Sequence, residues 1–219
     1  TIIPFLEDED IQNIHSIFVS HYDADHIGGL LDLIPGKDKT LGTDDDWIPL
    51  KGIWDRGDKE TDNKSYFPPY NTLTFPWRHT VLPGDQWTID GITFTAVVVN
   101  GTYENGFDTF LSEDDENGKS LGLLVEHKNF RYLTAGDLTG GGASGTKETL
   151  NLEGHLGEIV GDIDILHISH HGSLTSTNEG FLDFTQPEMA LISVGEPNDF
   201  GHPHPMVLER LLNRGISIY

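Results

Sequence analysis

The chain has 219 residues, which favours one large domain, and 36% of them are hydrophobic, enough for a sizeable core. It contains no cysteine, which excludes disulfide bonds, thiolate zinc sites and cysteine nucleophiles. The 13 basic and 36 acidic residues give a formal net charge of -23, so the surface disfavours long stretches of nucleic acid.

Targeting signals are not recognisable in the sequence. No apolar run is long enough to cross a bilayer, and there is no signal peptide. The first residues, "TIIPF", resemble the interior of a protein, so we expect that a preceding segment was trimmed or is missing. The sequence is compatible with a cytoplasmic and with an exported protein, and the compartment stays undetermined.

Apolar patterning predicts strands and helices along most of the chain, without a domain boundary, so we expect a single domain over 1–219. Strands are predicted at 16–20, 93–99, 120–127, 130–135, 162–169, 189–195 and from 216 onward, with a hairpin at Lys128-Asn129. Helices are predicted at 27–34, 178–185 and 205–215. Residues 36–80 are expected to form long loops around one or two strands. This alternation predicts an α/β fold.

The stretch "SHYDADHIGG" follows the first predicted strand and carries four good metal ligands within six residues. In an extended segment, His21, Asp23 and Asp25 point to the same side. His26 follows where the chain is expected to turn into a helix. Imidazole nitrogens and carboxylate oxygens suit Zn, Mn or Fe, and four such ligands can serve two ions. The stretch therefore predicts a metal site at the end of a strand.

This stretch resembles the first motif of the metallo-β-lactamase fold superfamily, usually His-x-His-x-Asp-His. Asp23 stands where the middle histidine is usual, and this variant resembles the branch of the ComEC-like competence proteins and the phosphorylcholine esterases. The resemblance covers roughly Ile14 to Tyr219. It implies a four-layer αβ/βα sandwich with the site at the edge where the two sheets meet.

Three later segments agree with this resemblance. "YLTAGDL" resembles the motif whose aspartate bridges both metals, which would be Asp137. "ISHHGS" resembles the final histidine motif, in which one histidine ligates metal and the other faces the substrate; we favour His171 as the ligand over His170. "FGHPHP" also matches this branch and would put His202 near the mouth of the pocket, whereas His204 either joins it or caps the next helix.

The second motif of the superfamily, normally a lone histidine, has no clear match. The candidates are His79, Asn100 and Asn117, and Asn117 with Ser120 resembles an Asn-Ser pair of ComEC-like chains. One metal is therefore expected to lack a nitrogen ligand. The remaining histidines are expected to be surface or packing residues; they are His15, His127, His155 and His167.

Both ends of the family pattern are incomplete. The Asp-x-Gly-x-Gly segment of the family's first strands does not precede Ile14, and the last strand is short. We expect a fold whose terminal strands are missing rather than a different fold.

The resemblance implies a dinuclear hydrolase that uses two divalent metal ions, Zn or Mn. The two metals would lower the pKa of a bridging water and make hydroxide available near neutral pH. Asp25 would ligate one metal and orient the nucleophile. His170 or His202 would donate a proton to the leaving group or bind phosphate.

The first interpretation of function is a phosphodiesterase or nuclease. The acidic charge favours small or single-stranded phosphodiester substrates and makes duplex nucleic acid an unlikely partner. An alternative is a phosphorylcholine esterase-like hydrolase, in which the segment from Trp47 to Trp87 cages a quaternary ammonium. The rival from another class is a non-catalytic metal-binding domain. β-Lactam hydrolysis is disfavoured by Asp23 and by the "HHGS" segment.

Overall fold

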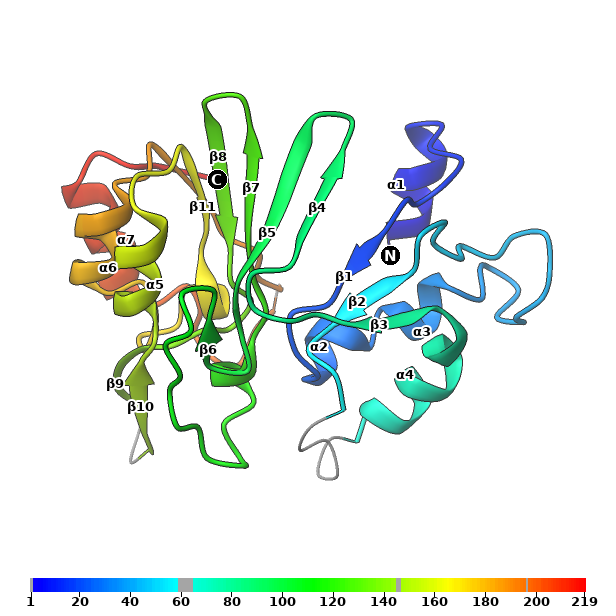
Figure 1. The fold of residues 1–219 in the computed structure, drawn as a ribbon, viewed down its shortest axis with the longest axis horizontal. Coiled ribbons are helices and arrows are strands. Elements are labelled where there is room, and N and C mark those ends of the chain that lie inside the picture. The colour runs from blue at the N-terminus through cyan, green and yellow to red at the C-terminus, as the bar shows by residue number, and fades with distance from the viewer. Residues whose placement is uncertain (1, 59–64, 145–146, 196) are drawn as a thin grey trace. The chain divides into compact units, whose positions relative to one another are not determined.

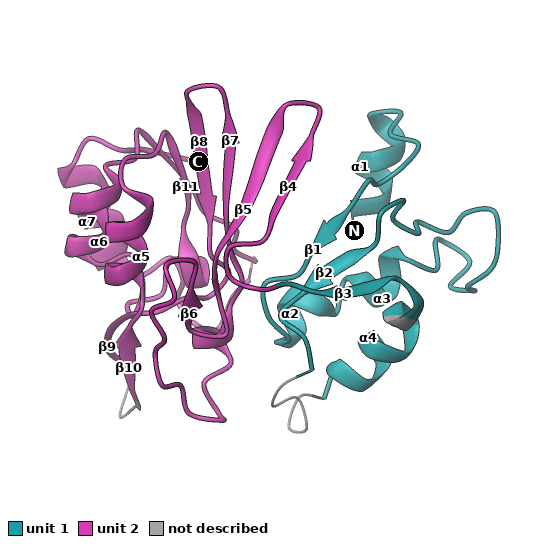
Figure 2. Ribbon diagram, viewed as in Figure 1, with its two compact units in different colours: residues 1–81 teal, residues 82–219 magenta. Residues whose placement is uncertain are grey.

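The computed structural model describes residues 2–58, 65–144, 147–195 and 197–219. The chain divides into two compact units, unit 1 at 1–81 and unit 2 at 82–219, which Figure 2 shows in different colours. The expected single domain depends on how these units combine, and it stays a prediction.

Unit 1 contains a small parallel sheet with helices around it (Figure 1). The strand order is β1-β2-β3, with β1 at Ile17–Phe18, β2 at Ile53–Asp55 and β3 at Arg78–Thr80. The helices are α1 (Ile2–Asp8), α2 (Ala24–Ile27), α3 (Leu30–Leu33) and α4 (Phe67–Thr74), and a 3-10 turn follows at Phe75–Trp77. Its main apolar core consists of Val19, Tyr22, Ile27, Ile34, Ile53, Phe67 and Tyr70.

Unit 2 is built on an eight-stranded mixed sheet in the order β13-β12-β11-β8-β7-β5-β4, with β6 paired to β5. The pairs from β13 to β8 are parallel and those from β8 to β4 are antiparallel. The strands are β4 (Gln86–Ile89), β5 (Ile92–Val99), β6 (Thr102–Tyr103), β7 (Gly122–His127), β8 (Phe130–Thr134), β11 (Ile165–His167), β12 (Met189–Leu191) and β13 (Ser217–Ile218). A separate antiparallel hairpin joins β9 (Gly140–Ser144) to β10 (Lys147–Asn151).

Three helices of unit 2 lie together beside the parallel part of this sheet (Figure 1). They are α5 (Glu153–Val160), α6 (Glu179–Thr185) and α7 (Pro205–Asn213), and 3-10 turns lie at Asn117–Lys119 and Ser169–Gly172. Leu156, Phe181 and Val207 of these helices share one buried cluster with Leu133 and Leu166 of the sheet. The helices therefore cover the sheet through a common apolar core.

The predicted α/β fold is confirmed, including the hairpin, where Lys128 adopts a positive φ of 56°. Two details of the prediction were wrong. The helix expected at 27–34 is two short helices, α2 and α3, and the first already begins at Ala24. The segment 36–80 contains the helix α4, which its two prolines and two threonines obscure and which buries Phe67 and Tyr70.

The parallel strands of unit 2 determine where its polar loops gather. Strands β8, β11 and β12 run in one direction, with Leu166 paired to Leu133 and to Ala190. The loops that leave their carboxyl ends therefore emerge at one edge of the sheet, the usual position of a site in such sheets. Asp137 follows β8, and the His170-His171 pair follows β11.

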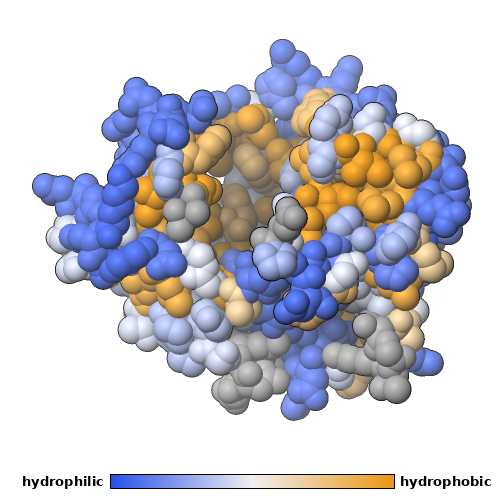
Figure 3. All heavy atoms as spheres, turned by 180° about the vertical axis from the view of Figure 1, so that it is seen from behind, coloured by the Kyte–Doolittle hydropathy of each residue, from blue (hydrophilic) through white to orange (hydrophobic). Residues whose placement is uncertain are grey.

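The surface is largely polar, in keeping with the acidic composition. Figure 3 shows hydrophilic residues over much of one face, with apolar areas between them. Among the helices of the described residues, none combines the length and apolar character that a membrane crossing requires.

Candidate metal site

The first ligand motif lies at the carboxyl end of β1 in unit 1. Residues 19–22 form no regular secondary structure, and Asp23, which precedes α2, is extended with φ -71° and ψ 154°. Asp25 and His26 then lie within α2, which corrects the expectation of an extended segment through Asp25 with His26 before the helix. Asp23 occupies the position before the helix, where Asp is common, but its side chain makes no capping hydrogen bond.

The structure brings the four predicted residues of this motif together as two His–Asp pairs. His21 Nε2 lies 3.7 Å from Asp23 Oδ2, and His26 Nε2 lies 3.7 Å from Asp25 Oδ2. The two imidazole rings are 4.0 Å apart between centroids. His21 is fully buried, whereas the Asp25 side chain is 64% exposed. Both Nε2 atoms thus face carboxylates, as the nitrogen ligands of a mixed nitrogen and oxygen metal site would.

Ser20 is a site residue that the sequence reasoning missed. Its Oγ lies 3.1 Å from Nδ1 of His21 and 3.3 Å from Nδ1 of His26. A hydroxyl has one proton, so it can donate to one ring and accept from the other. Metal-binding histidines usually have their second nitrogen held in this way. The sequence signal that could have identified Ser20 was its hydroxyl, which immediately precedes His21, the first candidate ligand.

A buried network holds the ligand stretch of unit 1 through Tyr22. The Tyr22 hydroxyl donates to the carbonyl of Gly57 at 2.9 Å and accepts from Arg78 at 3.1 Å. Arg78 also makes a bidentate pair with Asp55 at 2.6 and 3.0 Å, and Tyr70 donates to the same carboxylate at 2.7 Å. Burial raises the pKa of the Tyr22 hydroxyl far above its usual value, with the Asp55 carboxylate adding to the effect. Tyr22 therefore acts as a neutral link between this network and the ligands on either side of it.

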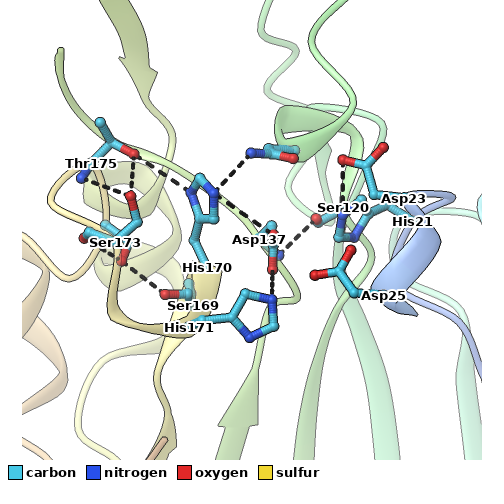
Figure 4. A network of polar contacts seen from close by, with 12 residues as sticks. His21, Asp23, Asp25, Ser120, Asp137, Ser169, His170, His171, Ser173 and Thr175 are labelled. Atoms are coloured by element: carbon cyan, nitrogen blue, oxygen red, sulfur yellow. Dashed lines mark hydrogen bonds and ion pairs between the residues drawn. The ribbon is translucent and has the colours of Figure 1, made fainter. Parts of the chain in front are cut away.

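In unit 2, Asp137 is the centre of the candidate site (Figure 4). It is 5% exposed, and its backbone N–H donates to Ser120 Oγ at 3.0 Å. Its Oδ2 lies 3.9 Å from Nε2 of His170, and its Oδ1 lies 3.7 Å from Nε2 of His171. The structure therefore places both predicted histidines at the predicted bridging aspartate.

The two histidines differ in what holds their rings. His171 donates from Nδ1 to the carbonyl of Ser193 at 2.7 Å, which in the neutral ring leaves the lone pair on Nε2, toward Asp137. His170 Nε2 lies 3.2 Å from the side-chain amide of Asn117, and its Nδ1 lies 3.5 Å from the Thr175 hydroxyl. A carbonyl on Nδ1 is the arrangement typical of a metal-binding histidine. His171 therefore has the contacts of a ligand.

The backbone at these histidines is unusual. His170 and His171 adopt positive φ angles of 52° and 54°, a region that non-glycine residues rarely occupy and that costs of order 1–3 kcal/mol each. Successive left-handed residues turn both imidazoles toward Asp137. Such strain is concentrated at functional sites in proteins.

The candidates for the second motif are separated by the structure. Asn117 contacts His170, and its partner Ser120 accepts from the backbone of Asp137. His79 lies on β3 of unit 1 and stacks on Trp54, with 4.5 Å between the ring centroids. Asn100 donates its backbone N–H to Lys119 at 3.2 Å. The Asn-Ser pair thus belongs with the unit 2 residues of the candidate site.

The "FGHPHP" segment also reaches this part of unit 2. The His202 ring lies 5.7 Å from the His170 ring in an edge-to-face arrangement. Burial lowers the pKa of His202, and the neighbouring His170 and His171 lower it further. His204 Nδ1 accepts from the Met206 backbone at 3.2 Å, so the prediction of a helix cap is confirmed.

The other histidines contact neighbours outside these ligand sets. His155 packs edge-on against Tyr103, and His127 lies 3.3 Å from the Gly91 carbonyl. His15 contacts the hydroxyl of Ser16, and His167 lies between Thr134 and Ser193 on the sheet.

Comparison with known families identifies the domain. The family model of the beta-lactamase superfamily domain matches residues 2–169 of the chain.

Two curated bacterial proteins are similar over nearly the whole chain. ComE operon protein 3 of Bacillus subtilis (strain 168) is 27% identical over 218 residues, which are 99% of this chain and 24% of that protein. Competence protein ComA of Neisseria gonorrhoeae is 28% identical over 219 residues, which are 99% of this chain and 25% of that protein. The chain thus spans about a quarter of the length of these relatives. Their names are consistent with the ComEC-like branch.

Solved structures with the same fold include metal proteins. Zn(2+)-bound PqqB from Methylobacterium extorquens has a TM-score of 0.52 and 14% identity, covering 94% of this chain and 71% of its own. CmlA, a diiron β-hydroxylase from Streptomyces venezuelae, has a TM-score of 0.53 and 13% identity, covering 96% of this chain and 44% of its own. At these identities the likeness shows the fold alone.

Proposed function

Because the chain belongs to the beta-lactamase superfamily domain family, we propose that it is a metal-dependent hydrolase and that its substrates are phosphodiesters. The observation that carries the proposal is the pairing of His171 with Asp137. A backbone carbonyl holds Nδ1 of this histidine, and its Nε2 points to a buried carboxylate. The His171 Nε2 atom and the Asp137 carboxylate are both groups that a divalent metal binds.

The proposed metal ligands are the residues predicted from the sequence. They are His21, Asp23, Asp25, His26, Asp137 and His171, a set of three imidazoles and three carboxylates. Within each unit, the side chains fit a divalent metal by their chemistry, because imidazole nitrogens and carboxylate oxygens are mixed. The contacts of Ser20 and Ser193 with Nδ1 atoms support Nε2 as the ligand atom of His21, His26 and His171.

When bound, divalent metals lower the pKa of water and neutralise negative charge on a phosphoryl group. The protein side chains have separate tasks. The Asp25 carboxylate orients the attacking nucleophile by accepting its hydrogen bond. His170 is directed by Asn117 and Thr175, and a ring N–H of this residue donates to a phosphoryl or leaving-group oxygen. His202, whose pKa is lowered by burial, serves as a neutral hydrogen-bonding partner for the substrate.

The charge of the chain defines the proposed substrate further. Duplex DNA carries one negative charge per about 1.7 Å of axis, and the chain has a formal net charge of -23. Two divalent ions would add positive charge only at the centre itself. We therefore favour small or single-stranded phosphodiesters, although the names of the competence relatives connect the family to nucleic acid.

The test is a substrate panel on protein supplied with Zn²⁺ or with Mn²⁺. It contains bis-p-nitrophenyl phosphate, p-nitrophenyl phosphorylcholine, single-stranded and duplex DNA, and nitrocefin. Metal-dependent cleavage of the first substrate and of single-stranded DNA supports the proposal. Preferred cleavage of the phosphorylcholine ester would replace it with the esterase alternative.

A non-catalytic binding domain would give a third outcome in the same experiment. The protein would retain stoichiometric metal by elemental analysis and would cleave no member of the panel. The presence of predicted metal ligands at nearly every motif and the strained backbone at His170 and His171 favour catalysis over this outcome.

A further inference from the structure

Phe200 is a highly exposed aromatic residue beside His202. Its side chain is 84% exposed, whereas proteins normally bury much of a phenylalanine. The ring stacks on His202, with 5.9 Å between centroids and 18° between planes, and the His202 ring in turn lies 5.7 Å from that of His170. One face of Phe200 is thus backed by an imidazole that borders the candidate site, and the high exposure leaves the other face open.

Hydrogen bonds fix the segment that carries Phe200 to the 3-10 turn at Ser169–Gly172, which contains His170 and His171. The side chain of Asn198 bonds both backbone groups of His202, accepting from N–H at 3.0 Å and donating to C=O at 2.8 Å. The His204 N–H donates to the carbonyl of Gly172 at 2.8 Å. A Cβ at Gly172 would meet Pro203 at 2.8 Å, so this glycine lets the two segments touch. Phe200 is therefore presented from an anchored loop.

An acidic protein that binds a phosphodiester needs attraction from uncharged groups. Aromatic rings supply it, because every nucleobase has a π-face that stacks without regard to sequence. We infer that Phe200 is a stacking platform for the nucleobase beside the scissile phosphate, an inference that rests on the proposed function. The substrate would then be a nucleotide phosphodiester. The platform selects for a base and is indifferent to which base it is.

The test measures binding rather than turnover. The probes are a phosphorothioate-linked tetrathymidylate and an abasic oligomer with the same backbone and charge, titrated into Mn²⁺-supplemented protein. Phe200→Ala should weaken binding of the thymidylate about 10-fold and change binding of the abasic oligomer less than about 2-fold. Phe200→Trp should keep the thymidylate affinity, because indole stacks at least as well as phenyl.

Phe130→Ala is the matched control. Phe130 is exposed at the start of β8, whereas Asp137 follows the opposite end of that strand. The control should bind both oligomers as the wild type does. Equal losses on both oligomers in Phe200→Ala, or no loss, would overturn the platform, as would a loss of phosphorylcholine binding with thymidylate binding intact.

The two proposals fail separately. Base-dependent binding through Phe200 without cleavage of any phosphodiester would overturn the proposed function and leave the platform in place. Cleavage of bis-p-nitrophenyl phosphate with binding that ignores the base would overturn the platform alone.

Discussion

The two units hold their site residues in different ways. In unit 1 the four candidate ligands lie within six consecutive residues, and the support beneath them is an ion pair, Asp55 with Arg78. In unit 2 the site residues come from segments far apart in the sequence, and a buried carboxylate of this unit, Glu153, is held mainly by backbone N–H groups. The first arrangement relies on a paired charge. In the second, within the part of the chain that the structure describes, backbone N–H groups are the main partners of the carboxylate.

Electrostatics makes these supports respond differently to change. A buried pair such as Asp55–Arg78 is strongly destabilised when one partner is removed, because the other charge stays buried. Burial raises the pKa of Glu153 to about 7, although the N–H groups of Thr177 and Asn178 lower it. Unit 1 should thus be sensitive to mutation of its carboxylate, and unit 2 to pH.

The largest effect is expected for Asp55→Ala. The substitution leaves Arg78 buried without its bidentate partner, and we expect a loss of about 3–5 kcal/mol in the free energy of unfolding. Denaturant unfolding followed by tryptophan fluorescence measures it, because three of the four tryptophans lie in unit 1.

Asp58→Asn is the control for this prediction. Asp58 also pairs with Arg78, at 2.7 Å, but its side chain is 69% exposed. Exposed pairs contribute at most about 1 kcal/mol, so this variant should unfold almost as the wild type does. Equal losses of unfolding free energy in Asp55→Ala and Asp58→Asn would show that burial does not decide how much each ion pair with Arg78 stabilises unit 1.

Glu153→Gln should separate the units by their pH response. The folded-state pKa of about 7 lies above the unfolded value near 4.5, so ionisation favours the unfolded chain. The contribution of Glu153 to the unfolding free energy of the wild type is fully present below about pH 4.5. It is lost as the pH rises to about 7, and the loss is roughly 3 kcal/mol. The glutamine still accepts from Asn178 but cannot ionise, so the variant should gain stability relative to the wild type over that window.

The measurement is the difference in unfolding free energy between variant and wild type at several pH values from 4.5 to 8. Glu148→Gln, at an exposed position on β10, should show a flat difference. A flat difference for Glu153→Gln as well would mean that this carboxylate stays ionised in the fold, with Arg210 as the nearest candidate to hold the charge.

Asp25→Asn tests the proposed catalytic chemistry of unit 1 rather than the stability of its fold. The side chain keeps its size and loses the charge that binds metal and orients the nucleophile. We expect kcat on bis-p-nitrophenyl phosphate to fall at least about 100-fold, near 2.7 kcal/mol of barrier. Asp32→Asn, at an exposed position on α3, should leave kcat unchanged. Wild-type turnover of Asp25→Asn at full metal occupancy would remove this residue from the mechanism.

The same contrast explains how far the sequence could predict the molecule. The six-residue motif of unit 1 is local, so its candidate ligands could be named directly from the sequence. The early start of α2 was missed because a four-residue helix leaves little periodicity. Asn117 and Ser120 were named only through the resemblance, and their contacts with His170 and Asp137 depend on strand order. Glu153 gave no signal, since its burial comes from packing among distant segments.

The smallest effect is expected for Ser20→Ala, which tests whether the ligands of unit 1 need orientation in addition to proximity. The substitution removes the hydroxyl that contacts Nδ1 of both His21 and His26, and such supporting contacts typically change metal affinity 10–100-fold. We expect a loss of about 10-fold for Zn²⁺ in competition with a chromophoric chelator, and near wild-type affinity for Ser20→Thr, which keeps the hydroxyl. Ser16→Ala is a close control, because Ser16 makes the same kind of contact, at 2.9 Å, with His15 outside the motif. Unchanged Zn²⁺ affinity in Ser20→Ala would mean that the packing around the buried His21 is enough to orient the two imidazole rings. Unit 1 would then differ from unit 2, where a hydrogen bond to the Ser193 carbonyl orients His171.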